Sequence, residues 1–121
     1  MTRVFVYGTL KRGQGNHHLI NQEPEATIIA ELPFRMISLG GFPALIPSDG
    51  TNYQIVGEVY SVDKDTFARL DRLEGYPQLY DRMQMDLKPF GIDDKAWFYY
   101  MRLNNGYMRS VNYVESGNWN R

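Results

Sequence analysis

Short runs of hydrophobic residues, several of them alternating with polar ones, recur along most of this chain. The first run is Val-Phe-Val-Tyr at residues 4–7, which is too short for a helix and consists of β-branched and aromatic residues. Such runs are typical of β-strands. The segments with this character are 4–7, 26–32, 34–39, 55–62, 80–87 and 96–103. The pattern predicts a mainly β structure in which the last two segments form an antiparallel pair.

Two further segments give weaker predictions. Residues 42–47, Phe-Pro-Ala-Leu-Ile-Pro, are apolar but contain two prolines, which cannot donate a backbone hydrogen bond. They therefore favour an edge strand or an extended loop. Residues 16–22 are expected to form one or two helical turns, with Asn16 as the cap.

One segment has the spacing of an amphipathic helix. Phe67, Leu70 and Leu73 recur every three residues and predict a buried stripe on a helix over residues 63–74. Asp63 is a suitable N-cap, and Gly75 is placed to end the helix. One helix among many short strands predicts an α+β fold, a small mixed sheet or barrel with helices packed outside.

Composition narrows the class of protein. A chain of 121 residues predicts a single domain over residues 1–121, and 43% hydrophobic residues are enough for a folded core. Thirteen basic and 14 acidic residues give a net charge of -1, so neither nucleic acid nor an anionic membrane is an expected partner. The absence of cysteine excludes disulfides, a thiol nucleophile and a cysteine metal site.

The N-terminus enters the first predicted strand after Met-Thr-Arg, without the long apolar core of a signal peptide. No run is long and apolar enough to span a bilayer. We therefore expect a cytoplasmic protein that does not bind membranes.

The loop after the first strand is a candidate binding site. Gly8 follows the strand, and a glycine at a strand end often marks the close approach of another group. Lys11 and Arg12 then precede Gly13 and Gly15 in a flexible, basic turn. Backbone N–H groups of such loops bind anions and developing oxyanions. An ordinary turn is the alternative interpretation.

Glu74 is the residue that fits least well as a structural one. It lies in the last turn of the predicted helix, where the negative end of the helix dipole disfavours a carboxylate by about 0.3–1 kcal/mol. The same field raises a carboxyl pKa toward the range useful for general acid–base catalysis. The alternative is an exposed glutamate paired with Arg72 or Arg82.

Other catalytic constellations find little support. His17 and His18 are the only histidines, and neighbours on a helix diverge by about 100°, so no metal site is expected. Residues 13–15 lack the lysine and hydroxyl of a phosphate-binding loop, and no serine lies in Gly-x-Ser-x-Gly.

Two stretches together carry a family resemblance: Val-Tyr-Gly-Thr-Leu at residues 6–10 and Leu-Asp-Arg-Leu-Glu-Gly-Tyr-Pro at residues 70–77. They resemble the Tyr-Gly-Ser/Thr-Leu and Leu-Asp-x-x-Glu-Gly signatures of the gamma-glutamylcyclotransferase family, which includes the AIG2-like proteins. Residues 41–45 and 57–60 match family-like positions between them, and 115–119 looks like the tail of the small bacterial subgroup. The similarity spans residues 3–102.

The resemblance implies a compact mixed β-barrel with flanking helices and a site that needs neither cofactor nor metal. It implies that a loop made by Tyr7, Gly8, Thr9 and Leu10 binds the glutamyl group through backbone N–H groups. Glu74 would be the catalytic acid/base. Tyr80 would place an aromatic hydroxyl near the pocket, with a purely structural tyrosine as the alternative.

The implied reaction converts a small-molecule gamma-glutamyl amine or gamma-glutamyl amino acid to 5-oxoproline and a free amine, a transferase or lyase type of cyclisation. Residues 42–47 and 88–94 are the loops expected to select the leaving amine. The sequence leaves that amine and the oligomeric state open. Two other functions are a module that binds small metabolites without turnover and a structural or interaction domain.

Overall fold

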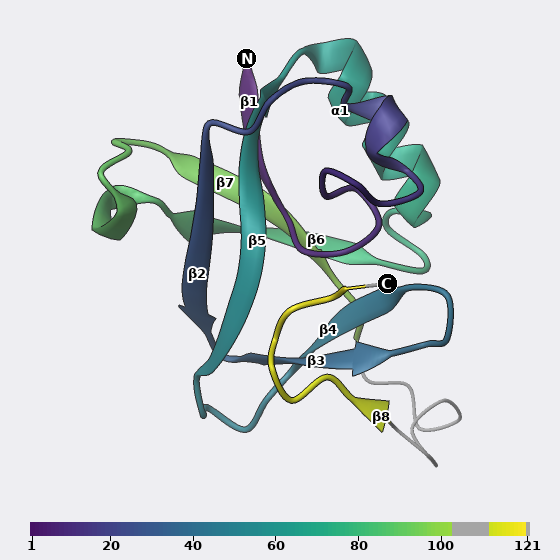
Figure 1. Ribbon diagram of the computed structural model, residues 1–121, viewed down its shortest axis with the longest axis vertical. Helices are drawn as coiled ribbons and strands as arrows, with labels where there is room; N and C mark the ends of the chain where they lie inside the picture. Colours follow the sequence, from purple (N-terminus) through teal and green to yellow (C-terminus); the bar gives the residue numbers. More distant parts are fainter. Residues whose placement is uncertain (103–111, 121) are drawn as a thin grey trace.

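The computed structural model describes residues 1–102 and 112–120, which form two β-sheets and one α-helix (Figure 1). The five-stranded sheet has the order β2-β5-β1-β7-β6. Its strands are β1 (Thr2–Val6), β2 (Ala26–Leu32), β5 (Tyr53–Val62), β6 (Asp81–Asp86) and β7 (Lys95–Tyr100). All neighbours are antiparallel except β1 and β7, which are parallel. The predicted pair over 80–87 and 96–103 is thus confirmed, although residue 103 lies outside the described residues.

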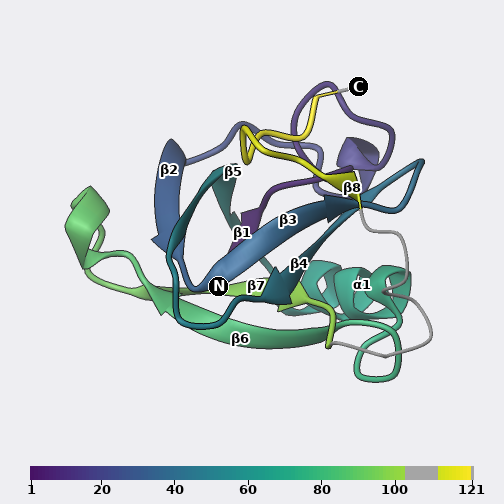
Figure 2. The same cartoon turned by 90° about the horizontal axis from the view of Figure 1, so that it is seen from below.

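The second sheet has the order β4-β3-β8, with β3 (Phe34–Ser38) between β4 (Pro43–Pro47) and β8 (Asn112–Tyr113). Its strands run across the direction of β2 and β5 (Figure 1), and Figure 2 shows α1 beside the two sheets. Pro43 and Pro47 begin and end β4, which pairs only with β3 among the described strands. The edge-strand prediction for residues 42–47 is therefore confirmed.

The expected barrel is not confirmed. The described strands form two separate sheets, and the edge strands β2 and β6 do not pair with each other. The chain leaves the first sheet at Pro33, directly after β2, and enters the second sheet at Phe34. A proline donates no ladder hydrogen bond, so strand pairing is interrupted at this corner.

The core lies on both faces of the five-stranded sheet, because side chains alternate along each strand. Phe5 and Val59 belong to a cluster that also contains residues of the second sheet, such as Met36. Val4 and Leu70 belong to a second cluster, which includes residues of the helix. Burial on both faces explains the uninterrupted apolar run at residues 4–7.

The helix α1 (Lys64–Glu74) begins and ends where predicted. Asp63 Oδ1 accepts a hydrogen bond from the Thr66 N–H at 2.7 Å. Gly75 adopts a left-handed conformation and donates to the Arg72 carbonyl, while Tyr76 donates to the Asp71 carbonyl at 2.9 Å. These paired bonds form a Schellman motif, which makes Glu74 the last residue of the helix.

The predicted stripe on α1 is only partly correct. Leu70 is fully buried and Phe67 is half-buried, but Leu73 is 40% exposed. Leu73 lies near the end of α1 and faces a pocket instead of the core.

Short 3₁₀ helices form at η1 (His17–Leu19) and η2 (Lys88–Phe90). Asn16 occupies the N-cap position of η1, yet its side chain makes no capping hydrogen bond there. In the part of the chain that the structure describes, no helix is long and apolar enough to cross a membrane.

Candidate active site

A pocket of about 360 Å³ lies where the loop after β1, the start of β4 and the end of α1 meet. All six sequence-predicted site residues line it: Tyr7, Gly8, Thr9, Leu10, Glu74 and Tyr80. Other residues that line it include Asn16, Phe42, Pro43, Leu73, Leu79 and Tyr99. The tertiary structure thus brings together segments that are more than sixty positions apart in the chain.

The loop after β1 presents backbone donors at this pocket. Within residues 1–102 and 112–120, the N–H groups of Gly8, Thr9 and Leu10 have no hydrogen-bond acceptor. The carbonyls of the same loop are occupied: Lys11 N–H donates to Gly8 at 3.0 Å, and Asn16 N–H donates to Thr9 at 2.9 Å. These bonds hold the loop in a turn and leave three donors for a ligand.

Gly8 allows β4 to approach this loop. A Cβ at position 8 would lie 2.7 Å from Cγ and 3.0 Å from Cδ of Pro43, which is closer than real Cβ contacts. The interpretation of Gly8 as a point of close approach is therefore confirmed. Pro43, which Gly8 contacts, begins β4 and lines the pocket.

Glu74 reaches the pocket from the end of α1. Its side chain is half-buried, and burial raises the pKa of its carboxyl from 4.5 to about 7. The sequence predicted this direction from the helix dipole, whereas the main cause in the structure is loss of water around the carboxylate. No described residue forms a hydrogen bond or ion pair with that carboxylate.

The alternative that Arg72 or Arg82 neutralises Glu74 is wrong for the structure. Arg82 Nε lies 3.0 Å from Asp71 Oδ1, and its guanidinium also packs against the rings of Tyr76 and Trp97. Arg72 is exposed and forms no ion pair with a described residue. A carboxyl with a pKa of about 7 and no fixed cation can take up and release a proton near neutral pH.

The two tyrosine hydroxyls are already occupied. Tyr7 donates to the Tyr99 carbonyl at 2.8 Å and accepts from the Leu45 N–H at 3.2 Å. Tyr80 donates to the Pro43 carbonyl at 2.8 Å. Burial and the nearby Glu74 charge raise the pKa of both phenols, so they are neutral near pH 7. Both rings line the pocket while their hydroxyls link strands and loops together.

Asn16 is the clearest pocket residue that sequence reasoning missed. Its side-chain amide donates to Thr9 Oγ1 at 3.0 Å and so supports the loop from within the pocket. In the sequence Asn16 has only the features of a helix cap, because its contact with Thr9 joins residues seven positions apart and forms when the loop folds back on itself.

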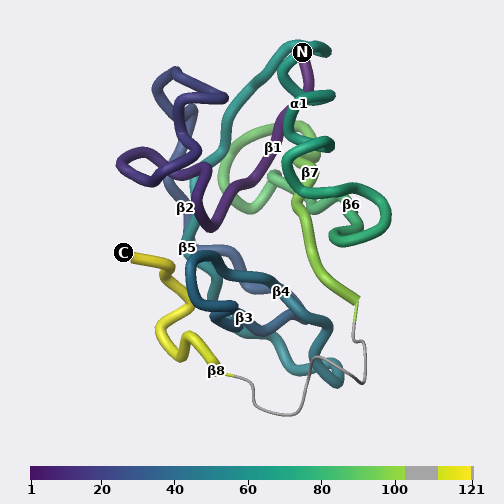
Figure 3. The backbone as a smooth tube through the Cα atoms, turned by 90° about the vertical axis from the view of Figure 1, so that its right-hand side faces the viewer, coloured from purple at the N-terminus to yellow at the C-terminus, as the bar shows by residue number. Residues whose placement is uncertain are grey.

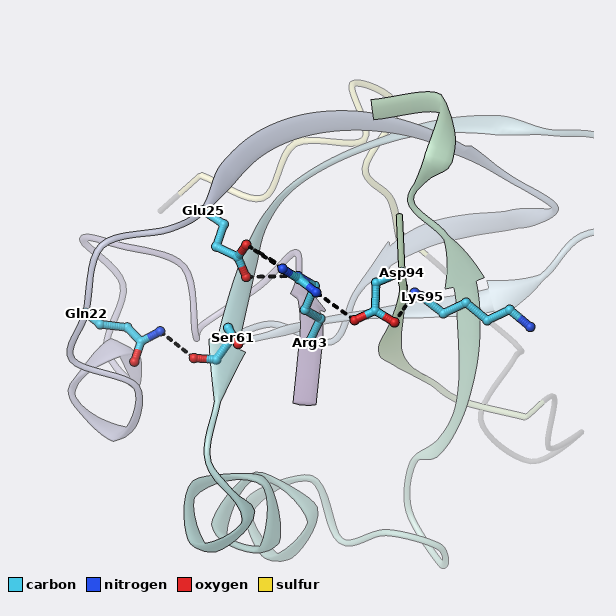
Figure 4. Close-up of polar contacts among 6 residues, drawn as sticks. All are labelled: Arg3, Gln22, Glu25, Ser61, Asp94 and Lys95. Carbon is cyan, nitrogen blue, oxygen red and sulfur yellow. Dashed lines mark hydrogen bonds and ion pairs between the residues drawn. The ribbon is translucent and has the colours of Figure 1, made fainter. Parts of the chain in front are cut away.

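Of the two loops expected to select the leaving amine, only residues 42–47 contribute to the pocket, through Phe42 and Pro43. Residues 88–94 lie on the side of the molecule opposite α1 (Figures 1 and 2). There Arg3 donates to Asp94 at 2.7 Å and to Glu25 at 3.0 Å (Figure 4). This half of the specificity prediction is wrong, because the hairpin turn between β6 and β7 extends away from the site.

The two histidines directly follow Asn16 at the end of the loop after β1. His17 Nδ1 lies 3.0 Å from the Leu10 carbonyl, and its ring lies 5.7 Å from that of Tyr60. Among the described residues, no group of three or more His, Cys, Asp or Glu side chains is arranged to hold a metal ion.

Known proteins with a similar sequence and fold identify the family. The family model described as gamma-glutamyl cyclotransferase, AIG2-like, matches residues 4–121. The gamma-glutamylcyclotransferase family protein YtfP of Citrobacter rodentium is 37% identical over 121 residues, covering 97% of this chain and 94% of that protein. Gamma-glutamylaminecyclotransferase A of Danio rerio is 38% identical over 79% of this chain and 66% of that protein.

A solved structure agrees with this assignment. The solution NMR structure of YtfP from Escherichia coli has a TM-score of 0.71 and 29% identity, covering 98% of this chain and 96% of that chain. The chain therefore belongs to the gamma-glutamyl cyclotransferase, AIG2-like family.

Proposed function

We propose that this enzyme of the gamma-glutamylcyclotransferase type converts a gamma-glutamyl amine or gamma-glutamyl amino acid to 5-oxoproline and a free amine. Glu74 is the general acid/base of the proposed reaction. One observation carries the proposal: the Glu74 carboxyl, whose pKa burial raises to about 7, lines the same pocket as three residues whose backbone N–H groups have no acceptor among the described residues.

The first step in this proposal is the removal of a proton from the substrate's own α-ammonium group by the Glu74 carboxylate. The resulting amine attacks the gamma-carbonyl carbon, and a bond between the two closes a five-membered ring. Because nucleophile and electrophile belong to one molecule, the pocket has only to hold a ring-forming conformer, which can lower the barrier by several kcal/mol.

The gamma-carbonyl oxygen becomes negatively charged as the ring closes. The N–H groups of Gly8, Thr9 and Leu10 are the proposed donors to this oxyanion, because these residues line the pocket and their N–H groups have no acceptor among the described residues. Glu74 then returns its proton to the departing nitrogen, and the original amide C–N bond breaks. The ring nitrogen, which still carries two protons after its attack, releases one of them to the regenerated Glu74 carboxylate, which passes it to the released amine or to water. The products are 5-oxoproline and the amine.

The leaving amine is proposed to lie against three apolar side chains. Phe42, Leu73 and Leu79 line the pocket and are 41%, 40% and 51% exposed, so they form its solvent-facing side. The Danio rerio relative is named for gamma-glutamylamines, which supports an amine leaving group for this chain as well.

A metabolite-binding module without turnover would be favoured by an ionised, exposed Glu74 that points away from the loop. Glu74 is instead half-buried and lines the same pocket as the loop, and burial raises the pKa of its carboxyl to about 7. The enzyme is therefore the better-supported function.

The decisive experiment measures 5-oxoproline release from a panel of gamma-glutamyl amines and dipeptides. Wild type is compared with Glu74→Gln, which keeps the size of the side chain but cannot take up a proton, and with the exposed control Glu31→Gln. General acid–base catalysis contributes about 10²–10⁴-fold, so Glu74→Gln should lose at least a hundredfold in kcat while calorimetry still detects substrate binding.

Binding without turnover by wild type would instead indicate a binding module. Equal turnover by wild type and Glu74→Gln would show that another residue is the acid/base.

A further inference from the structure

Lys11 is a buried cation that the proposed reaction does not use. It directly follows Leu10 in the chain, and the residue is only 8% exposed to solvent. Its ammonium donates to Asn118 Oδ1 at 2.9 Å and to the Trp119 carbonyl at 2.6 Å. Lys11 therefore connects the loop of pocket donors to the far end of the chain.

Its two acceptors belong to residues 114–119, which we call the C-terminal strap. The strap runs beside β5 and β3 (Figures 1 and 3). The Gly117 carbonyl accepts from the Val56 N–H at 2.8 Å, and the Val114 N–H donates to the Met36 carbonyl at 2.9 Å. Trp119 is buried in the core. The strap is thus fixed to both sheets.

The strap is also packed closely against β5. A Cβ at Gly117 would lie 1.8 Å from the Gln54 carbonyl oxygen, so the backbone could not approach β5 as it does with another residue there. This contact fixes the position of the neighbouring Asn118, and with it one of the two acceptors for Lys11.

A second buried group holds the other end of the same turn. Glu58 Oε1, on β5, accepts from the Arg12 N–H at 2.8 Å and from the Tyr60 hydroxyl at 2.7 Å. Successive residues of the loop, Lys11 and Arg12, are therefore tied to two different buried partners. Burial lowers the pKa of the Lys11 ammonium, and the nearby negative charge of Glu58 partly opposes this shift.

A charge at this position is costly, which argues for a specific role. Removing an ammonium from water costs free energy that hydrogen bonds must offset, and an apolar side chain of similar length would fill the same volume without that cost. What an apolar side chain lacks is directional hydrogen bonding, which specifies the position of the loop relative to the strap.

We propose that Lys11 is a positioning residue: by binding the C-terminal strap, it holds the N–H groups of Gly8, Thr9 and Leu10 in the geometry that the oxyanion requires. The proposal rests on the proposed function. It makes the tail of the chain part of the catalytic apparatus without any contact to substrate. The loop turn itself closes through the Lys11 N–H bonded to the Gly8 carbonyl, so a shift of Lys11 moves the donors directly.

The first test compares Lys11→Met with Arg12→Met, using gamma-glutamyl-butylamide as substrate. Arg12 is the matched control, because it is the next basic residue and its side chain lies at the surface in an ion pair with Glu23. A misplacement of about 1 Å can cost 10²-fold in rate, so Lys11→Met should lower kcat about 10- to 100-fold. The KM should change less than about threefold, because the loss is confined to the transition state.

A kcat of Lys11→Met within about twofold of the kcat of Arg12→Met would overturn the proposal. A merely structural lysine would lower the melting temperature and leave the kcat of the folded protein unchanged. The melting temperature of each variant is therefore determined first, and kcat is measured well below it.

Chemical rescue separates the ammonium from its packing. The chain contains no cysteine, so Lys11→Cys introduces a single thiol. Alkylation of the unfolded chain with 2-bromoethylamine, followed by refolding, creates a side chain nearly identical to lysine, whereas alkylation with bromopropane adds similar bulk without charge. The proposal expects the aminoethyl form to recover most of the wild-type kcat and the propyl form to remain impaired. Equal activity of the two forms would overturn it.

A measurement independent of activity distinguishes this proposal from the proposed function. Nitrogen-15 relaxation of Gly8, Thr9 and Leu10 should report lower order parameters in Lys11→Met than in wild type or Arg12→Met. Unchanged order in Lys11→Met would overturn the positioning role even if no substrate were turned over. Absence of turnover in wild type, with the loop loosened in Lys11→Met, would instead count against the proposed function alone.

Discussion

Arg82 pairs with Asp71, three residues before Glu74 on the same helix, and not with Glu74 itself. The Arg82 Nε lies 3.0 Å from Asp71 Oδ1, and the same carboxylate oxygen accepts from the Tyr99 hydroxyl at 2.7 Å. Asp71 thus pairs with Arg82, whose guanidinium lies over the rings of Phe67 and Tyr76. Glu74 is left without a cation among the described residues, and burial alone determines its pKa.

The raised pKa of Glu74 predicts the pH dependence of the reaction. The carboxylate form accepts the proton from the substrate, so kcat/KM should rise with pH and level off above about pH 7. Below the pKa the slope should approach tenfold per pH unit. The measurement is kcat/KM for gamma-glutamyl-butylamide from about pH 5 to about pH 9. An acidic limb with its inflection near the ordinary value of 4.5 would contradict the assignment of Glu74.

Glu74 also predicts a pH dependence of stability. The folded protein binds this proton more tightly than the unfolded chain, since the pKa is about 7 instead of 4.5. The contribution of Glu74 to stability is therefore fully present below about pH 4.5 and is lost as pH rises through 7. Glu74→Gln should match wild type at the acid end and be more stable at pH 8, by about 2 kcal/mol after allowance for partial solvent contact.

Urea unfolding at both ends of this pH range measures the difference. The exposed Glu31→Gln serves as the control and should show no comparable change with pH. Equal stability of Glu74→Gln and wild type at pH 8 would mean that the Glu74 carboxylate is well solvated.

Two glycines of one loop should respond differently to alanine. At Gly8 the added Cβ would lie 2.7 Å from Pro43 Cγ, whereas at Gly15 nothing lies within 4 Å. Gly8→Ala should cost about 1–3 kcal/mol of unfolding free energy and displace the pocket loop from β4. Gly15→Ala should remain within about 0.5 kcal/mol of wild type. Thermal unfolding and kcat/KM of both variants test this, and equal effects would argue against a close contact at Gly8.

The position of Leu79 in the pocket predicts a preference for apolar leaving amines. Leu79 lines the pocket and is 51% exposed, so contact with a leaving group would remove much of its side chain from water. Leu79→Ala should lower kcat/KM for gamma-glutamyl-butylamide about fivefold, because about 1 kcal/mol of transition-state stabilisation from apolar contact is lost. For gamma-glutamylglycine, which lacks the apolar chain, kcat/KM should change little.

The matched control is Ile29→Ala, which truncates a similarly exposed apolar side chain on β2 outside this pocket. A uniform loss for both substrates in Leu79→Ala would place the leaving group elsewhere.

Local features of the sequence were sufficient to predict most elements. The limits of α1 follow from Asp63 and Gly75, which act within a few residues of the helix ends. The strands β2 and β4 follow from alternation and from the two prolines of β4. Glu74 and the loop after β1 were also identified in this way, because one violates the preference of a helix end and the other is rich in glycine. The family resemblance supplied their proposed roles.

Contacts between distant segments decided which residues line the pocket and which lie away from it. Leu73 has helical spacing with Leu70, yet it is 40% exposed and lines the pocket, whereas Leu70 is fully buried. Residues 88–94 were expected to select the leaving amine, but the direction of the β6–β7 hairpin takes them away from the site.

Lys11 shows most clearly how a contact between distant segments decides the environment of a residue. In the sequence it is one basic residue in a flexible turn, and its partner Asn118 is 107 positions away. Local preferences depend on neighbours in the chain, which a sequence displays directly. The burial of Lys11, the raised pKa of Glu74 and the shape of the pocket depend on which distant groups exclude water, and this is established only when both sheets, α1 and the C-terminal strap have packed together.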